Sequence, residues 1–543
     1  MIEAPEAQRP LSRGDVLLLV SALLIVTILL GRGILAAGEF ALGEDESRHA
    51  VTGMYFADFL SDLPLRHPVQ YTYRYYAQYP ALGLIHWPPF FHFVEGVAFR
   101  LAGLSPLVAR GTVLGFALFG LVFWFLLLRK LLNREAAVFG TLLLAFLPAM
   151  LIYEQSVMLE VPSLALCLAA TYFWIGALWE RSLRALYWFA FLAALAMLTK
   201  QQSLYLLPFC ALTAWTEGAG RWLLTWKAAR AGALLMAMIL PFYLLAARVH
   251  LTSIAEHVLP GPKTQFAPLF YFRSLASDLG WPVLLLSAVG LLGAYWWSPW
   301  RVTRVMLLWL AACYLSFTFL HAKAPRYGIY WLPVFIYFAC WPLAAGFKVR
   351  RQRALAWVLC AIVLATAGYS AWRRHPAYLS GYAQAARRIS QLPGRNVLLF
   401  DGEENGNLIF ALRAADPQRR FVVVRKGLYT TRITPRFGKQ ELVHDQEGIE
   451  QLLADYGIRY ILVTDGADYL FPVQQTLRVM LQGSQFKLMD SFPIISDRAQ
   501  PLSSRLLLYE FLQATRPKQQ YLRVRMMTLS DDIVVPLKDL GIE

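Results

Sequence analysis

Residues 15–36 read DVLLLVSALLIVTILLGRGILA, and shortly after them residues 43–49 read GEDESRH. The first stretch is apolar and long enough to cross a bilayer as a helix. Its apolar part, Val16 to Leu35, is too long for the core of a signal peptide, and no small-residue cleavage site leads into a soluble domain. We therefore expect a retained membrane anchor with an acidic stretch just beyond it.

The rest of the chain continues this apolar pattern. Of its 543 residues, 57% are hydrophobic and 16% charged, whereas soluble domains are about half apolar and a quarter charged. Five cysteines lie in apolar stretches without CxxC spacing, so neither a disulfide framework nor a zinc site is predicted. We predict a polytopic α-helical membrane protein with about 11 transmembrane helices, namely 15–36, 105–128, 135–152, 161–179, 183–199, 203–216, 231–249, 281–297, 304–320, 327–346 and 354–371.

The distribution of basic residues predicts the orientation in the membrane. The net charge is +16, and 16 Lys and Arg residues lie in the N-terminal tail and five short connections that would share one side. Short loops rich in Lys and Arg face the cytoplasm. We therefore expect a cytoplasmic N-terminus and, after an odd number of spans, an extracytoplasmic C-terminus. Much of the positive charge is then an orientation signal, and nucleic acid is not an expected partner.

The composition changes after Trp372. Short β-rich runs at 397–400, 421–424 and 460–463 alternate with helical patterns such as 449–456, which predicts a small α/β domain. No glycine-rich phosphate loop follows a strand, so no nucleotide cofactor is expected. We divide the chain into a membrane domain, 1–372, with a long external first loop at 37–104, and a soluble extracytoplasmic α/β domain, 373–543.

The external first loop opens with three adjacent carboxylates, Glu44, Asp45 and Glu46. Neighbouring carboxylates repel one another unless a cation compensates. One interpretation is a solvated acidic turn that caps a following helix at 47–60, and the triplet alone favours it. The other is a functional site, because ionisable residues at the end of a membrane span are functional candidates.

The same loop contains several tyrosines between Tyr71 and Tyr79 and the sequence His86-Trp-Pro-Pro-Phe-Phe-His92. Tyrosine and tryptophan at this depth are typical of anchors in the membrane interface, although a surface that stacks on a sugar or guides a lipid is an alternative. His86 and His92 are candidates for metal ligands or for ordinary hydrogen-bonding residues. The proline pair interrupts any helix there.

Three further external turns carry polar groups, namely Tyr153-Glu-Gln-Ser-Val-Met-Leu-Glu-Val-Pro162, Thr199-Lys-Gln-Gln-Ser203 and His321-Ala-Lys-Ala-Pro-Arg-Tyr327. Taken singly, Lys200, Lys323 and Arg326 are explained by snorkelling to lipid headgroups. All of them, however, share one predicted side with the acidic triplet. Carboxylates that activate a hydroxyl and cations that hold a phosphate leaving group are the parts of a transfer reaction.

At these residues the chain resembles the GT-C glycosyltransferases, in particular the protein O-mannosyltransferase and lipid A aminoarabinose transferase families. The resemblance covers about residues 10–372 and rests on five motifs in order on one predicted face. These motifs are Asp45-Glu-Ser-Arg48, Trp87-Pro-Pro-Phe90, Met158-Leu-Glu-Val-Pro162, Leu198-Thr-Lys-Gln201 and Lys323-Ala-Pro-Arg-Tyr327.

The resemblance implies a glycosyltransferase in a bacterial inner membrane. It would move a sugar from a polyprenyl monophosphate to a lipid, glycan or protein acceptor in one inverting displacement. Asp45, with Glu46, would be catalytic, and Asp45 would act as the general base. The donor phosphate would be bound by Lys200, Lys323, Arg326, Tyr327 and Arg48, and the acceptor or sugar would be contacted by Glu154, Glu160, Trp87 and Gln202.

Two departures from the family pattern concern a metal. Similar transferases often have Glu-Lys before the proline pair, where this chain has His86-Trp87, and that Glu is thought to bind a divalent metal. Either His86 replaces it as a ligand for Mg or Mn, or no metal is used. The aspartate that is common in the second motif is Glu160 in this chain, one methylene longer.

Two other classes compete with the transferase interpretation. A lipid or solute transporter or flippase would be indicated by repeated halves and by helix breaks midway through the membrane; the sequence has no repeated halves, and its ionisable residues lie at span ends. A non-catalytic membrane scaffold would leave the five polar motifs without a role. The sequence does not identify the sugar, the polyprenol, the acceptor or the oligomeric state.

Overall fold

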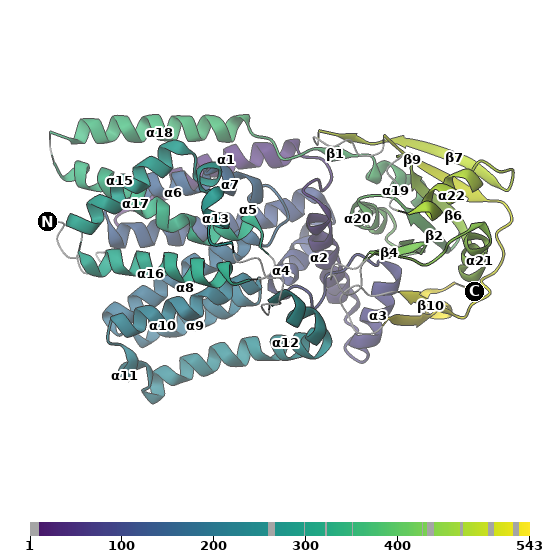
Figure 1. Ribbon diagram of the computed structural model, residues 1–543, viewed down its shortest axis with the longest axis horizontal. Coiled ribbons are helices and arrows are strands. Elements are labelled where there is room, and N and C mark those ends of the chain that lie inside the picture. Colours follow the sequence, from purple (N-terminus) through teal and green to yellow (C-terminus); the bar gives the residue numbers. More distant parts are fainter. Residues whose placement is uncertain are drawn as a thin grey trace.

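The computed structural model describes residues 10–258, 267–297, 299–320, 323–349, 351–425, 427–431, 439–466, 471–497, 504–524 and 532–542. Figure 1 shows an elongated molecule with a bundle of helices at one end and a domain that contains a β-sheet at the other. The helices of the first loop lie between these two parts. This is the predicted order of a membrane domain followed by a C-terminal α/β domain.

Within the described ranges, six helical segments are long and apolar enough to cross a membrane. They are α1 (Arg13–Ala36), α5 (Pro106–Leu131), α8 (Glu160–Glu180), residues 226–248 of α12 (Trp226–Val258), residues 325–346 of η2 (Pro325–Trp331) and α17 (Leu332–Lys348), and α18 (Arg353–Arg373). Helix α8 is the most buried of the six, whereas α1, α12 and α18 expose most of their apolar residues. An exposed apolar helix surface is what lipid contact requires. The predicted class of polytopic helical membrane protein is confirmed.

The structure does not confirm the exact number of eleven spans, and two of the expected spans are divided into shorter elements. Residues 135–152 divide into α6 (Arg134–Ala145) and α7 (Pro148–Tyr153), because Pro148 has no N–H to continue the first helix. Residues 203–216 divide into the 3₁₀ turn η1 (Gln201–Tyr205) and the short helix α10 (Leu206–Thr216). The other helices of this part are α9 (Leu183–Met197), α11 (Gly220–Leu223), α13 (Phe270–Arg273), α14 (Leu275–Leu279), α15 (Trp281–Trp297) and α16 (Trp300–Thr318).

The first loop folds into three helices, α2 (Glu44–Asp62), α3 (Pro68–Gln78) and α4 (Phe90–Ala102). Helices α2 and α4 cross closely, because a Cβ atom on Gly96 would lie 2.9 Å from the carbonyl oxygen of Gly53. Helix α2 also packs against α20 (Asn405–Ala415) of the C-terminal domain. It therefore lies between the membrane helices and that domain, as Figure 1 shows.

The C-terminal domain is built on a five-stranded sheet in the order β3-β2-β6-β9-β7, with β3, β2 and β6 parallel and the other two antiparallel. The predicted strands at 397–400, 421–424 and 460–463 are its parallel core. The strands of the domain are β1 (Leu379–Ser380), β2 (Asn396–Asp401), β3 (Phe421–Arg425), β4 (Tyr429–Thr431), β5 (Lys439–Glu441), β6 (Ile458–Thr464), β7 (Phe486–Pro493), β8 (Ile495–Ser496), β9 (Arg505–Phe511), β10 (Tyr521–Val524) and β11 (Ile533–Pro536).

The alternation of side chains along β2 divides the domain into two layers. Leu398 and Phe400 belong to the hydrophobic core that includes α19 (Tyr382–Ser390), α20 and the membrane helices. Val397 and Leu399 belong to a second core with α21 (Gln446–Tyr456) and α22 (Pro472–Met480). The 3₁₀ turn η3 (Leu537–Leu540) closes that second core. One face of the sheet is thus continuous with the membrane domain.

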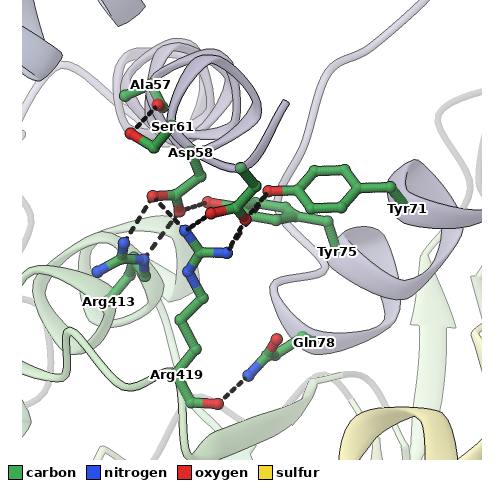
Figure 2. A network of polar contacts seen from close by, with 9 residues as sticks. Ala57, Asp58, Ser61, Tyr71, Tyr75, Gln78, Arg413 and Arg419 are labelled. Carbon is green, nitrogen blue, oxygen red and sulfur yellow. Dashed lines mark hydrogen bonds and ion pairs between the residues drawn. The ribbon is translucent and has the colours of Figure 1, made fainter. Parts of the chain in front are cut away.

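A buried polar network also joins the two domains near the end of α2 (Figure 2). Asp58 accepts hydrogen bonds from Arg413 of α20 at 2.6 and 2.8 Å and from the hydroxyl of Tyr75 at 2.6 Å. Arg419 forms a second ion pair with Asp58 at 2.9 Å and also pairs with Asp62. These contacts link α2 and α3 to residues more than 300 positions away in the sequence.

Candidate active site

Three carboxylates begin helix α2, and each has a different partner. Glu44, Asp45 and Glu46 occupy its first turn, where negative charge is favoured by the helix dipole. Glu44 pairs with Arg48 one turn later, and Asp45 pairs with Arg326 of η2. The triplet therefore does begin a helix, as the first interpretation expected, and at the same time sends Asp45 toward a residue 281 positions away.

Asp45 is the outermost member of a line of alternating charges. Its Oδ2 atom accepts a hydrogen bond of 3.0 Å from Nη1 of Arg326, and the side chains are 33% and 30% exposed. The Nε atom of Arg326 lies 3.3 Å from Oε1 of Glu160. The same Oε1 atom accepts from Nζ of Lys200 at 2.5 Å. We call these four residues the charge line; its inner end is buried and its outer end is open.

Each inner member of the charge line lies at the start of a helical element or directly before it. Glu160 is the first residue of α8, Lys200 directly precedes η1, and Arg326 lies at the start of η2. The side chain of Glu160 is fully buried, so its charge requires compensation. Two cations balance two carboxylates within the line. Burial lowers the pKa of the Lys200 ammonium, and the adjacent Glu160 carboxylate opposes this shift.

Glu46 is held away from the charge line by backbone groups. Its Oε2 atom accepts from the N–H groups of Ala41 and Leu42 at 2.9 and 2.8 Å, and its Oε1 atom accepts from the N–H of Val157 at 3.1 Å. Arg110 of α5 lies 3.4 Å from the same carboxylate. This buried arrangement joins the first loop to the membrane helices. Sequence reasoning grouped Glu46 with Asp45, whereas the structure gives it bonds that are typical of a structural residue.

The predicted phosphate ligands divide into two groups. The ring of Tyr327 lies 6.0 Å from Nζ of Lys200, so Tyr327 joins the charge line together with Lys200 and Arg326. Lys323 instead donates to the backbone oxygen of Leu320 at 2.9 Å. Arg48 pairs with Glu44, and its charge acts on Arg425 of the C-terminal domain. The structure thus brings three of the five candidates together around Glu160.

The segment from His86 to His92, which contains the proline pair, packs beside the turn that carries Lys200. Trp87 lies 4.3 Å from the ring of His49, ring centre to ring centre, and covers Gly83, where a Cβ atom would meet the indole at 2.1 Å. The side chain of Gln201 donates to the backbone oxygen of His86 at 2.8 Å. Sequence reasoning proposed Gln202, whose Oε1 atom has no hydrogen-bond partner among the described residues. The neighbouring Gln201 is the residue that joins the two motifs.

Glu154 is buried, and neither carboxylate oxygen has a hydrogen-bond partner within the described part of the chain. Burial raises the pKa of Glu154 well above its usual value and so favours its protonated form. A neutral carboxyl group can donate one hydrogen bond to a sugar hydroxyl. Its predicted role as an acceptor or sugar ligand therefore stays a prediction.

The described residues do not provide a good metal site near His86. No group of three or more His, Cys, Asp or Glu side chains within the described ranges is arranged to hold an ion. The two carboxylates of the charge line already face Arg326 and Lys200. A divalent metal usually needs several oxygen or nitrogen ligands from the protein and from bound groups. A metal ligand role for His86 stays a prediction, and we derive no step from it.

A pair of buried histidines, His49 and His92, lies one helical turn from Asp45; sequence reasoning named His92 but missed its pairing with His49. Nδ1 of His49 and Nε2 of His92 are 3.0 Å apart. Burial lowers the pKa of both rings, to about 3 for His92, and the nearby charges of Lys200 and Arg326 lower that of His49 further. His49 follows Asp45 by four residues, a spacing that places both on one face of a helix. That spacing was visible in the sequence.

Comparisons with known proteins agree with this architecture. The family described as "Dolichyl-phosphate-mannose-protein mannosyltransferase" matches residues 86–244. ArnT from Cupriavidus metallidurans bound to undecaprenyl phosphate has 16% sequence identity and a TM-score of 0.59, and the match covers 92% of this chain and 98% of that one. The apo state of the same protein also matches with a TM-score of 0.59, over 93% and 99% of the two chains. No curated protein matches the sequence.

A weaker structural match is the oligosaccharyltransferase AglB from Archaeoglobus fulgidus, solved with an inhibitory peptide and a dolichol phosphate. It has 13% identity and a TM-score of 0.47, and the match covers 83% of this chain and 69% of that chain. The ArnT matches span nearly the whole of both chains at 16% identity and therefore show that this chain has the fold of ArnT.

Proposed function

We propose that this chain is a membrane glycosyltransferase that moves a sugar from a polyprenyl monophosphate to a hydroxyl or amine of a lipid, glycan or protein acceptor. The observation that carries the proposal is the charge line, in which a carboxylate and a guanidinium that are each about one third exposed form the open end of a buried ion-pair chain. The name of the family that matches residues 86–244 and the undecaprenyl phosphate bound by ArnT support this donor class.

Asp45 is the proposed general base. It takes the proton of the acceptor hydroxyl or amine while the acceptor atom forms a bond to the anomeric carbon. The bond between that carbon and the phosphate oxygen breaks in the same displacement, and the phosphate keeps the electron pair. One displacement inverts the anomeric configuration.

Arg326 and Lys200 are the proposed stabilisers of the leaving phosphate. A guanidinium presents several N–H donors in one plane and suits a phosphate, whereas an ammonium acts as a point charge. In the structure Arg326 already contacts Asp45, so a phosphate that binds Arg326 competes with the carboxylate and leaves it available for the acceptor. Glu160 then acts as a positioning residue, since it holds both cations from the buried side.

The remaining candidates complete the proposal. Tyr327, Lys323 and Arg48 are proposed contacts to the donor phosphate, and Trp87, Glu154 and Gln202 to the sugar or acceptor. We propose that the reaction takes place on the extracytoplasmic face of a bacterial inner membrane, with the N-terminus in the cytoplasm. The ion pairs of Asp45 with Arg326, of Arg326 with Glu160 and of Glu160 with Lys200 place the starts of η2, α8 and η1 beside the first-loop helix α2.

The test is transfer by the purified full-length protein from radiolabelled polyprenyl phosphate sugars to candidate acceptors, with Asp45→Asn as the variant. We expect Asp45→Asn to fold and to bind polyprenyl phosphate but to form no glycosidic bond. Unchanged turnover would remove Asp45 as the base. Movement of labelled lipid across vesicles without any glycosidic product would favour the alternative of a transporter or flippase.

A further inference from the structure

The segment that leads into α2, and so to Asp45, is held by the C-terminal domain. Residues 37–43 connect α1 to α2. Their backbone forms hydrogen bonds with α20 and β1, and the carboxylate of Glu39 accepts from the first turn of α19. On the opposite side, Arg110 donates to the backbone oxygens of Gly38 and Glu39 at 2.8 and 2.9 Å. The start of α2 is therefore fixed between the membrane helices and a domain that follows it by more than 300 residues.

Asn407 of α20 provides the most specific of these contacts. Its Oδ1 atom accepts from the N–H of Phe40 at 2.9 Å, and its Nδ2 atom donates to the carbonyl oxygen of the same residue at 2.8 Å. Both Asn407 and Phe40 are buried. A side-chain amide that satisfies both polar groups of one peptide position fixes the chain there as a neighbouring strand would.

Glu39 anchors the same segment to the first turn of α19. Its carboxylate accepts from the N–H groups of Tyr382 and Ala383 at 3.1 and 2.7 Å, and its own N–H donates to the oxygen of Leu379 at 2.7 Å. The first N–H groups of a helix have no partner within the helix, so a carboxylate at that position satisfies them.

Gly406 allows α20 to approach the first turns of α2. A Cβ atom at this position would lie 2.2 Å from Oγ and 2.7 Å from Cβ of Ser47, which is buried and two residues after Asp45. Ser47 also donates to the backbone oxygen of Glu44, within the same turn. A side chain at position 406 therefore requires α20 and the turn that carries Asp45 to shift relative to each other.

We propose that the C-terminal domain positions the general base, and that Asn407 and Gly406 are positioning residues for the transfer reaction. This inference rests on the proposed function, in which Asp45 takes the proton of the acceptor. The domain holds the first turn of α2 against the charge line, so that the carboxylate stays within reach of Arg326 and of the acceptor. A displacement of about 1 Å at a reacting group can cost on the order of 10²-fold in rate.

Gly406→Ala in the full-length protein is the main test. We expect kcat for sugar transfer to fall about 10–100-fold. The KM for the donor and the equilibrium binding of polyprenyl phosphate should change less than about threefold, because the groups that bind the donor in the ground state are not removed. Asn407→Ala removes both hydrogen bonds to Phe40 without adding bulk and is expected to show the same loss of kcat. It serves as the second variant if Gly406→Ala does not fold.

The double variant Gly406→Ala/Ser47→Gly distinguishes positioning from a general loss of structure. Glycine at position 47 removes the atoms that the new Cβ would meet, so we expect kcat to recover, whereas Ser47→Gly alone stays close to the wild type. Arg419→Gln is the matched control, because it weakens the same domain interface at Asp58, roughly 20 Å farther along α2 at 1.5 Å per residue. We expect this control to lower the unfolding temperature without the loss of kcat.

Three results would overturn the inference. One is a normal kcat in both Gly406→Ala and Asn407→Ala, another is no recovery in the double variant, and the third is an equal loss of kcat in Arg419→Gln. If Asp45→Asn retains full activity, the proposed function itself is wrong. If Asp45→Asn is inactive and the positioning variants are normal, only the role of the C-terminal domain is wrong.

Discussion

The two ends of helix α2 carry the same kind of interaction in different surroundings. At its start, Asp45 forms one hydrogen bond with Arg326, and about a third of each side chain is exposed. Near its end, Asp58 is 6% exposed, accepts from Arg413 and Tyr75, and forms a further ion pair with Arg419 (Figure 2). One carboxylate has a single accessible partner, whereas the other is saturated.

The ion pair of Asp45 with Arg326 can therefore exchange a partner, whereas the buried ion pairs of Asp58 cannot. An exposed ion pair contributes little to stability, so a phosphate or an acceptor can replace one member at small cost. A buried pair leaves an uncompensated charge when one member is removed, and that costs several kcal/mol. We therefore expect substitutions at the start of α2 to change the rate of transfer and substitutions at its end to change the stability of the protein.

Arg326→Gln is expected to have the largest effect on catalysis. Removal of a preorganised cation from a leaving phosphate lowers kcat by about 10²–10³-fold. The free energy of unfolding should change by only about 1 kcal/mol, because the pair with Asp45 is partly exposed and Glu160 keeps Lys200. Transfer assays and thermal unfolding of the same preparation check both parts. A large loss of stability with unchanged kcat would contradict the comparison.

Asp58→Ala is expected to have the opposite profile. It leaves Arg413 and Arg419 without their buried carboxylate and should cost about 3–5 kcal/mol of unfolding free energy. Asp62→Ala is the matched control, because Asp62 pairs with the same Arg419 but is 34% exposed, and its loss should cost less than about 1 kcal/mol. Denaturant unfolding measures both variants. Equal costs would show that burial does not distinguish the two carboxylates.

Glu95 of α4 lies against the middle of α2, and a Cβ atom on Gly53 would meet its carboxylate at 2.2 Å. Neither of its oxygens has a hydrogen-bond partner among the described residues, and burial raises the pKa of Glu95 well above its ordinary value of 4.5. The folded protein then keeps this proton above pH 4.5, where the unfolded chain loses it. Stability contributed by this group therefore falls as the pH rises.

Glu95→Gln removes the ionisable carboxyl group that lies against the middle of α2. It therefore tests a third position on this helix, between Asp45 and Asp58. The wild type should lose about 1.4 kcal/mol per pH unit from this group between pH 4.5 and its raised pKa, and the variant should not. Unfolding of both proteins between pH 4 and pH 8 measures the difference, which should be smallest at the acidic end. A constant difference across this range would show that Glu95 is charged in the folded protein.

The sequence was sufficient to predict the membrane class, the α/β domain and part of the site. Lys200 and Arg326 were predicted as site residues because placing a charge near the hydrocarbon of the membrane costs free energy, so a charged residue at the end of an apolar span is a functional candidate. The network around Asp58 was not predictable, because Arg413 is 355 residues away and its charge had no local signal. The tyrosines of α3, expected as membrane anchors, include Tyr75, which donates to Asp58.

Other differences have local physical causes. The predicted span at 135–152 is interrupted because Pro148 begins a new helix, which a hydropathy pattern does not register. Glu46 was grouped with Asp45 because adjacent residues look equivalent in a sequence. Successive residues of a helix point in different directions, so one carboxylate reaches Arg326 and the other reaches the backbone of Val157.

The smallest effect is expected at His86, which tests whether a metal compensates the charge at the start of α2. The charge line is already balanced by Arg326 and Lys200, and no group of three His, Cys, Asp or Glu ligands is formed by the described residues. We therefore expect transfer to continue in EDTA, and His86→Ala to respond to EDTA as the wild type does. Loss of activity in EDTA that Mg or Mn restores in the wild type, with a weaker dependence in His86→Ala, would instead assign a metal to this residue. The charge of Asp45 would then be balanced by a divalent ion as well as by Arg326. Asp45 would differ from Asp58, whose partners are arginines and a tyrosine, in the kind of partner as well as in exposure.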